Sequence, residues 1–243
     1  MENIRRMLVK YAADAGISVS AHQAEQFQAY LELLTEWNQK MNLTAITEPR
    51  EIVVKHFLDS ILLLNAYGIP RGARVIDIGT GAGFPGLPLK IMRDDLSLTL
   101  LDSLNKRLIF LKDVCEKLEI SAGLIHARAE EAGRKKEMRG SYDLVAARAV
   151  APLNILCEYC LPLVKTGGVF AAMKGPGGPE ELSAAQNALS LLGADAGNIR
   201  SFSLPDGSAR TILLMKKTAP TSDKYPRASA KIAKSPLERI QTS

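Results

Sequence analysis

The sequence predicts an α/β fold built on a mostly parallel sheet, with a helical segment ahead of it. Two observations carry this prediction. From Arg74 onward, short apolar runs rich in β-branched residues alternate with amphipathic segments of helix length, which favours a parallel sheet covered on both faces. Before that point, apolar residues recur at helical spacing.

The helical N-terminal segment is expected over residues 1–70. Ser20 and Gln23 match a capping box at the start of a helix. The apolar residues that follow, with Trp37 beside them, repeat at helical spacing: Ala24, Phe27, Leu31, Leu34 and Met41. Another helix is expected over residues 47–66, with a proline in its first turn.

Residues 71–217 are expected to form the sheet and its covering helices. The seven predicted strands are Arg74–Ile78, Leu98–Asp102, Gly123–Ala127, Asp143–Ala147, Val169–Met173, Ile199–Ser203 and Arg210–Lys216. The predicted helices are Pro85–Met92, Lys106–Leu118, Glu130–Glu137, Pro152–Val164 and Pro179–Leu192. The last two strands are separated by residues 204–209 alone, which fits a hairpin.

Composition and length are those of an ordinary soluble protein. The chain has 243 residues, of which 47% are hydrophobic and 23% charged, enough for one domain with an appendage. Charged residues interrupt the N-terminus, so we expect no signal peptide, and no apolar run approaches the roughly 20 residues that cross a bilayer. These features predict a cytoplasmic protein without a membrane partner.

The basic excess lies mostly in a C-terminal tail, residues 218–243. The net charge is +5, and this tail holds five bases and two acids, which is +3 of the total. Such a tail is either a solvated, disordered end or an arm that contacts phosphates. Lys224 and Arg227 are its candidate RNA contacts.

The three cysteines predict neither a disulfide framework nor a metal site. Their number is odd, and only Cys157 and Cys160 stand in a C-x-x-C pattern. A zinc ion would need two more ligands, for which Cys115 and three histidines are loose candidates. Buried cysteines of a helix, with no metal, are the favoured interpretation.

Residues 75–86 carry the main functional signal. An apolar strand leads into Asp77 and then into Gly79, Gly81 and Gly83, a turn whose backbone a nucleotide can approach closely. The stretch also satisfies G-x-G-x-x-G, with Asp102 standing 21 residues after Gly81, so an NAD-dependent oxidoreductase is one interpretation. An acid beside the turn disfavours a pyrophosphate and favours S-adenosylmethionine, which carries a net positive charge.

Polar residues follow the next strands at the sheet edge where ligands collect. Asp102 can accept both ribose hydroxyls of an adenosine, or it caps the following helix. Glu130 can hold the adenine amino group, or it favours a helix N-terminus. Arg148 ends the fourth strand, and Lys174 follows the fifth, where it is either an RNA contact or an exposed lysine in a loop.

Several ordered stretches resemble one family. They are Trp37-Asn38, Asn42-Leu43-Thr44, His56-Phe57-Leu58-Asp59-Ser60, residues 77–88, residues 102–107, Ala129-Glu130-Glu131, residues 147–151, Lys174-Gly175, Tyr225-Pro226-Arg227 and Ser235-Pro236-Leu237. Together they are similar to the ribosomal RNA small-subunit methyltransferase G family, also called glucose-inhibited division protein B. The tail departs from that pattern, because residues 228–233 lack the expected glycine and proline.

This resemblance implies a Rossmann-like class I methyltransferase fold and transfer of a methyl group from S-adenosylmethionine to N7 of a guanosine, number 527, in the 530 loop of 16S rRNA. The RNA partner is then 16S rRNA, the small subunit or an assembly intermediate. The resemblance assigns donor contacts to Gly79, Phe84, Ala129, Glu130 and Arg148. The residue patterns above add Asp77, Gly81, Gly83 and Asp102 to them.

The chemistry of N7 fits residues 147–151, Ala-Arg-Ala-Val-Ala, where amino-group methyltransferases often carry an Asn/Asp-Pro-Pro-aromatic turn. N7 has a lone pair and no proton to lose, so no general base is needed, and alignment with the methyl group is worth roughly 7–11 kcal/mol in favourable cases. Arg148 is expected to position a reactant by binding guanine O6, the donor carboxylate or a phosphate, or else to pair with an acid. His56 and Asp59 share a helix face, either at the active site or as a surface pair.

One further alternative comes from another class of protein. The basic tail is also compatible with an RNA-binding protein that has no catalytic activity.

Overall fold

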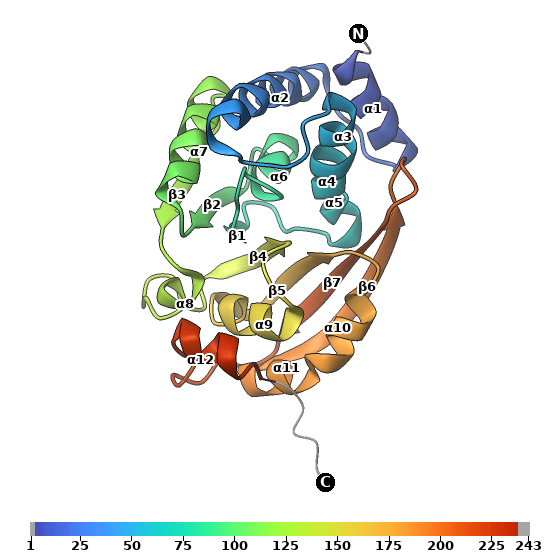
Figure 1. The fold of residues 1–243 in the computed structure, drawn as a ribbon. Helices are drawn as coiled ribbons and strands as arrows, with labels where there is room; N and C mark the ends of the chain where they lie inside the picture. The colour runs from blue at the N-terminus through green and yellow to red at the C-terminus, as the bar shows by residue number, and fades with distance from the viewer. Residues whose placement is uncertain (1–2, 238–243) are drawn as a thin grey trace.

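A computed structural model describes residues 3–237 of the chain. Its centre is a seven-stranded sheet in the order β3-β2-β1-β4-β5-β7-β6, with β7 antiparallel to both of its neighbours and the remaining pairs parallel (Figure 1). The strands are β1 (Arg74–Ile78), β2 (Ser97–Asp102), β3 (Ala122–His126), β4 (Tyr142–Arg148), β5 (Val164–Lys174), β6 (Ala194–Ser203) and β7 (Ala209–Lys217). The predicted fold class, strand number and final hairpin are confirmed.

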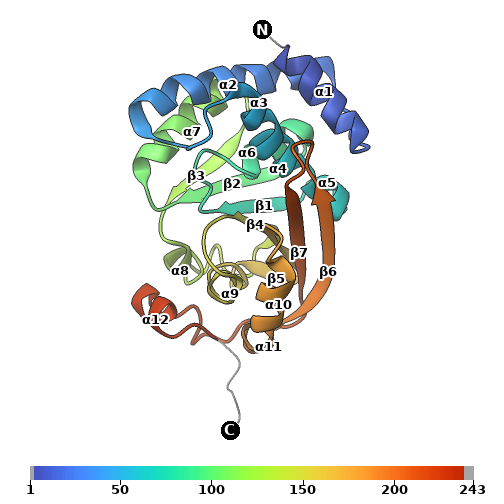
Figure 2. The same ribbon diagram turned by 45° about the vertical axis from the view of Figure 1, so that its right-hand side comes forward.

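Helices cover both faces of this sheet, as Figures 1 and 2 show. One face carries α1 (Ile4–Asp14), α2 (Ala21–Met41), α3 (Pro49–Ile52), the π-helical segment η1 (Val53–Leu58), α4 (Asp59–Ile61), α5 (Leu63–Ala66), α6 (Gly86–Met92) and α7 (Asn105–Lys117). The other carries α8 (Ala129–Ala132), α9 (Leu153–Cys160), α10 (Gly178–Ala184), α11 (Gln186–Leu192) and α12 (Ser229–Lys234).

Strand β4 shows why the sheet needs helices on both faces. Its residues 144–147 are all fully buried, and successive side chains enter opposite hydrophobic cores: Leu144 and Ala146 join one, Val145 and Ala147 the other. Successive side chains of a strand point to opposite faces, so a continuous apolar run requires cover on both.

Several predicted helix boundaries were wrong. The helix expected over residues 130–137 ends at Ala132, and the one expected over 152–164 ends at Cys160. The long helix expected over 179–192 is two helices that meet at Ala185. The Ser20 capping box is confirmed, because Ser20 Oγ accepts from the Gln23 amide and the Gln23 side chain accepts from the Ser20 amide.

The tail is ordered over its described part, up to residue 237. Tyr225 and Leu237 are buried in the same core as α9, and Ile232 of α12 is fully buried. Arg139 holds the tail by donating to the carbonyls of Thr221, Ser222 and Tyr225. The alternative of a disordered tail is therefore wrong for residues 218–237; residues 238–243 lie outside the described part.

Candidate active site

The glycine turn between β1 and α6 is held by Asp77. This side chain is fully buried, and its Oδ2 accepts from the Gly86 amide at 2.9 Å and from Thr80 Oγ1 at 2.7 Å. Burial raises the pKa of Asp77 to about 6. Asp77 was expected to contact the donor, but its bonded oxygen ties the two ends of the turn together, and it does not line the cavity described next.

A small cavity lies beside this turn, at the carboxyl ends of β1 to β4. This glycine-loop cavity has a volume of about 140 Å³, and its lining is Ile78, Gly79, Leu101, Ser103, Ala127, Arg128, Ala129, Glu130, Val150 and Tyr159. Glu130 is buried and its Oε1 has no hydrogen-bond partner within the described residues. Three predicted donor contacts, Gly79, Ala129 and Glu130, therefore come together around one cavity.

Gly79 forms the closest approach of this turn to the segment after β4. Its φ is +65°, and a Cβ on it would lie 2.8 Å from Cγ2 of Val150. A side chain at this position is therefore excluded twice, by backbone conformation and by space. Val150 lies in the stretch 147–151 that the sequence singled out, but we did not predict it as a site residue.

Asp102 is engaged with its own surroundings. It is 1% exposed, accepts from the amides of Gly81 and Leu104 at 2.9 Å each, and pairs with Arg107 at 3.2 Å. The predicted helix cap is not formed, because α7 has Leu104 as its N-cap without a side-chain cap bond; the carboxylate instead joins the Gly81 amide of the turn to the Leu104 amide ahead of α7, and its contact with the donor stays a prediction. Gly81 is thereby bonded to β2 instead of lining the cavity.

An aromatic cluster supports the turn from the N-terminal side. The Tyr30 hydroxyl of α2 donates to the carbonyl of Ala82, and a Cβ on Gly83 would collide with that hydroxyl. Phe84 stacks between Tyr30 and His56, with ring centroids 5.4 and 4.5 Å apart. Gly83 and Phe84 were expected to contact the donor, and the structure packs both against the helices.

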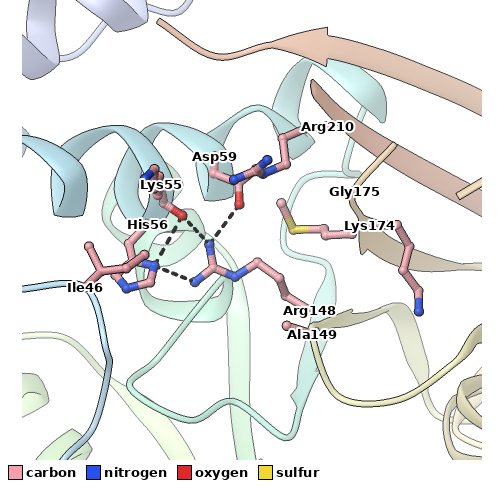
Figure 3. Close-up of a pocket in the computed structure, with 10 residues that line it drawn as sticks. Ile46, Lys55, His56, Asp59, Arg148, Ala149, Lys174, Gly175 and Arg210 are labelled. Carbon is pink, nitrogen blue, oxygen red and sulfur yellow. Dashed lines mark hydrogen bonds and ion pairs between the residues drawn. The ribbon is translucent and has the colours of Figure 1, made fainter. Parts of the chain in front are cut away.

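Arg148 at the end of β4 joins the sheet to η1 and α4 (Figure 3). Its guanidinium donates to Asp59 Oδ2 and to the Lys55 carbonyl at 2.9 Å each, and to His56 Nδ1 at 3.1 Å. It also lies over the Phe84 ring, 5.0 Å from the centroid. The predicted pairing of Arg148 with an acid is what the structure shows, and His56 and Asp59 are buried, not a surface pair.

His56 is held as a neutral imidazole. Burial and the nearby Arg148 lower its pKa to about 3. Because a guanidinium only donates, Nδ1 accepts from Arg148, and Nε2 carries the proton that it donates to Thr44 Oγ1 at 2.9 Å. Both ring nitrogens are thus occupied by neighbours.

A second cavity opens beside this network, and we call it the cationic cavity. Its volume is about 340 Å³, and its lining is Ile46, Lys55, His56, Asp59, Arg148, Ala149, Met173, Lys174, Gly175 and Arg210. Four of these side chains are cationic and one is a carboxylate. Asp59 is shared, because Arg210 Nε also approaches its Oδ1 at 3.3 Å.

Lys55 and Arg210 were missed as site residues. Strand β7 is antiparallel to β5, with Thr211 paired to Lys174, so β7 begins where the parallel strands end. Arg210, next to its start, therefore reaches the same edge as Arg148. The predicted hairpin between the last two strands already implied that the final strand begins at this edge, so the sequence contained a signal for Arg210.

Two predicted RNA contacts have other roles in the structure. Lys174 is only 9% exposed at its side chain and bonds to Glu181 and to the Ala151 carbonyl, each at 2.7 Å, so it is not a free loop lysine. Arg227 forms three side-chain bonds to Glu158, which is fully buried, and donates its backbone amide to the same carboxylate. Burial thus commits both cations to acids.

Of the predicted tail contacts, Lys224 remains exposed. Its Nζ lies 5.2 Å from the ring centroid of Tyr225.

Cys157 and Cys160 are fully buried, and burial raises the pKa of both thiols. Among residues 3–237, no cluster of three or more His, Cys, Asp or Glu side chains could hold a metal ion, and no helix is long and apolar enough to cross a membrane.

Comparison with known proteins gives consistent matches. Residues 23–212 match the family described as rRNA small subunit methyltransferase G. The chain is 46% identical over 228 residues to the ribosomal RNA small subunit methyltransferase G of Bacillus velezensis and 48% identical to that of Bacillus cytotoxicus. Each alignment covers 93% of this chain and 95% of the relative.

Solved structures share the fold at low sequence identity. A 16S rRNA (adenine(1408)-N(1))-methyltransferase from Catenulisporales acidiphilia superposes with a TM-score of 0.52 at 14% identity, covering 62% of this chain and 87% of the other. TrmN from Thermus thermophilus gives a TM-score of 0.51 at 18% identity, covering 68% and 53%. These likenesses establish the architecture.

Proposed function

The chain belongs to the rRNA small subunit methyltransferase G family, so it is a methyltransferase, and we propose that it transfers a methyl group from S-adenosylmethionine to N7 of guanosine 527 in the 530 loop of 16S rRNA. The names of its relatives give small-subunit ribosomal RNA as their substrate, and the proposal starts from that RNA. The donor, the acceptor atom and the site residues follow from the arguments below.

One observation carries the proposal. The glycine-loop cavity and the cationic cavity are both lined by the segment 148–150, which is the last residue of β4 and the two residues after it. Val150 lines the first cavity, whereas Arg148 and Ala149 line the second. Two ligands that met across this segment would be neighbours, as donor and acceptor must be in a direct transfer.

The residues of the glycine-loop cavity fit the donor chemically. Glu130 offers a buried carboxylate oxygen that lacks a partner, suited to an adenine amino group, and Gly79 lets a ligand approach the backbone. S-adenosylmethionine supplies an electrophilic methyl group on sulfur. At about 140 Å³ the cavity is smaller than the roughly 300–1,000 Å³ typical of such ligands, so we infer that Val150 moves away from Gly79 when the donor binds.

The cationic cavity is suited to the acceptor. At about 340 Å³ it falls within the range for small-ligand sites. Its four cations are already paired with acids, Lys55 with Glu51 and Asp206, Lys174 with Glu181, and both arginines with Asp59. As charged N–H donors they still suit the phosphate and O6 of a guanosine. A donor hydrogen bond to N7 would occupy the lone pair that must attack. We therefore assign base recognition here to bonds with O6.

The surroundings of His56 agree with a transfer that uses no general base. The imidazole accepts from Arg148 and donates to Thr44, so neither nitrogen is free to take a proton. Guanine N7 has none to give. Catalysis then rests on alignment of N7 with the methyl group, worth roughly 7–11 kcal/mol in favourable cases.

Arg148 acts in this proposal as a positioning residue. Its terminal nitrogens bond to Lys55, His56 and Asp59, which fixes the end of β4 against η1. Asp59 and His56 act through the same bonds. This arrangement replaces the expected direct bond from Arg148 to the base or to the donor carboxylate.

The test is transfer of label from S-adenosylmethionine to unmodified 16S rRNA and to 30S subunits that lack the modification, followed by chemical cleavage at 7-methylguanosine. Label at guanosine 527 of the 530 loop is the expected result. Label at another nucleotide, or at another atom of guanosine, would overturn the assignment. Calorimetry with S-adenosylmethionine and with NAD, the ligand of the rival oxidoreductase interpretation, checks the donor separately.

A further inference from the structure

A third cavity lies next to the cationic cavity and shares Ile46 with it. We call it the amide cavity. It has a volume of about 350 Å³ between the end of α2 and the residues that follow, and its lining is Leu34, Thr35, Asn38, Gln39, Asn42, Thr44, Ile46, Thr47 and Ile52. All of these side chains are uncharged, in contrast to the neighbouring cavity.

The lining is divided into an apolar floor and a polar rim. Leu34 and Ile52 are buried, whereas the rim side chains are exposed: Thr35, Gln39, Asn42 and Thr47. Within residues 3–237, the side-chain amides of Gln39 and Asn42 have no hydrogen-bond partner. An aliphatic surface beside free amides suits a flat, uncharged group with donors and acceptors on its edge.

The wall between the two cavities is fixed by hydrogen bonds. The Asn38 side chain donates to the Thr44 carbonyl at 3.0 Å and accepts from the Thr44 amide at 2.9 Å. Thr44 Oγ1 accepts from the Ile46 amide at 3.0 Å and from His56 at 2.9 Å. Ile46 and His56 lie side by side in Figure 3. The amide cavity thus has a defined position relative to the cationic cavity.

We propose that the amide cavity binds the base of an unpaired nucleotide that directly neighbours the acceptor guanosine in the RNA chain. This inference rests on the proposed function, because it takes the acceptor to occupy the cationic cavity. Sequence-specific RNA recognition targets unpaired bases, which are hydrogen-bonded along their edges and usually stacked on an aromatic or arginine side chain. In the amide cavity the aliphatic side chains of Leu34 and Ile52 would take the place of that stacking surface. The uncharged lining selects a base here and leaves the phosphates to the cationic side.

The test removes the two free amides without disturbing the backbone. Asn42 has a φ of +47°, which glycine adopts without strain, and Gln39 is exposed on α2, so the double variant Gln39→Ala/Asn42→Gly is expected to fold normally. Two lost hydrogen bonds should raise KM for the RNA substrate about 5- to 20-fold. We expect kcat within about twofold of wild type and an unchanged Kd for S-adenosylmethionine.

A matched control is Gln28→Ala, which removes an amide from the same helix outside the cavity and should leave KM unchanged. In vitro transcripts of 16S rRNA that carry each of the other bases at the two neighbours of the acceptor identify the contacted position. Wild type should discriminate among bases at one neighbour, and the double variant should lose that discrimination.

An unchanged KM for the double variant, or a raised KM with wild-type discrimination at both neighbours, would overturn the inference. The second outcome would mean that the amides contact another part of the RNA or a ribosomal protein. Failure of the proposed function looks different, since wild type itself would then place no label on N7 of the guanosine.

Discussion

The guanidinium of Arg148 and the carboxylate of Asp59 form a buried ion pair at 2.9 Å between residues 89 positions apart in the sequence. Their side chains are 14% and 6% exposed. The pair holds the last residue of β4 against α4 and lines the cationic cavity, so we expect its loss to lower stability and, under the proposed function, to disturb the alignment of the substrates.

Removing Arg148 should destabilise the fold. Arg148→Met leaves Asp59 buried with Arg210 as its remaining ion-pair partner, which we expect to cost about 3 kcal/mol of unfolding free energy, as is typical for a broken buried pair. Urea unfolding measures the loss. In a double-mutant cycle, Asp59→Asn/Arg148→Met should cost less than the two single changes added together. Additive losses would mean that the pair contributes no coupling.

For S-adenosylmethionine binding, the lack of space beside Gly79 should matter more than the backbone conformation of this residue. Gly79→Ala places a Cβ 2.8 Å from Cγ2 of Val150, in the space that the donor is inferred to enter once Val150 moves away, so we expect it to weaken S-adenosylmethionine binding at least tenfold in calorimetry. Gly72→Ala is the matched control, since Gly72 also has a positive φ, +68°, but no atom within 4 Å of the added Cβ. If both variants bind the donor equally well, the close approach at Gly79 is not part of the site.

The Tyr30 hydroxyl should stabilise the glycine turn. Tyr30→Phe leaves the Ala82 carbonyl without this donor in a buried setting, which typically costs about 1–3 kcal/mol. We expect reduced unfolding free energy together with weaker S-adenosylmethionine binding. Tyr11→Phe loses only a 3.4 Å surface bond from Arg50 and serves as the reference. Lost stability with unchanged donor binding would show that the Tyr30 hydroxyl stabilises the fold but does not contribute to the donor site.

The two tail cations should respond differently. Arg227→Ala strands the fully buried Glu158 and should cost about 3–5 kcal/mol of stability in urea unfolding. Lys224→Ala changes an exposed side chain, so stability should stay within about 0.5 kcal/mol while the salt dependence of RNA binding becomes shallower. If the salt dependence of RNA affinity is the same as for wild type, Lys224 does not contact the RNA.

His56 should make the fold sensitive to acid. Its pKa is about 3 in the folded state against 6.5 in the unfolded chain, so the unfolded state binds more protons between these values and stability falls as pH drops through them. The contribution of His56 to this loss should be about 2 kcal/mol at pH 5 relative to pH 7.5.

Asp77 opposes this trend, because its raised pKa of about 6 makes the folded state the better proton binder between about pH 4 and 6. Comparing wild type with His56→Gln, in which Asp77 is unchanged, isolates the histidine contribution. The stability difference between them should shift by about 2 kcal/mol from pH 7.5 to 5. A difference independent of pH would show that His56 is protonated normally in the folded protein.

The sequence was sufficient for the strands and their order along the chain because local patterns determine them. It was not sufficient for α12 in the tail, nor for the helix expected over residues 47–66, which is divided into α3, η1, α4 and α5. β1 was predicted with its observed bounds, Arg74–Ile78, since its β-branched residues Val75, Ile76 and Ile78 favour a strand. Helix ends were less predictable: the break at Ala185 has no proline or glycine beside it, whereas the early end at Ala132 coincides with Gly133, a signal that the prediction overlooked. The residues gathered at the strand ends, notably Gly79, Ala129 and Glu130, followed from the rule for parallel sheets.

The sequence could not predict which partners the charged side chains find. Arg148 and Arg227 each find a buried acid, and Lys174 finds Glu181, through contacts that depend on how the helices pack against the sheet. By itself, the sequence determined the fold class, the glycine turn and the family. Only the tertiary structure decided which charges remain available to a ligand, because burial commits a cation to an acid wherever the two are removed from water together.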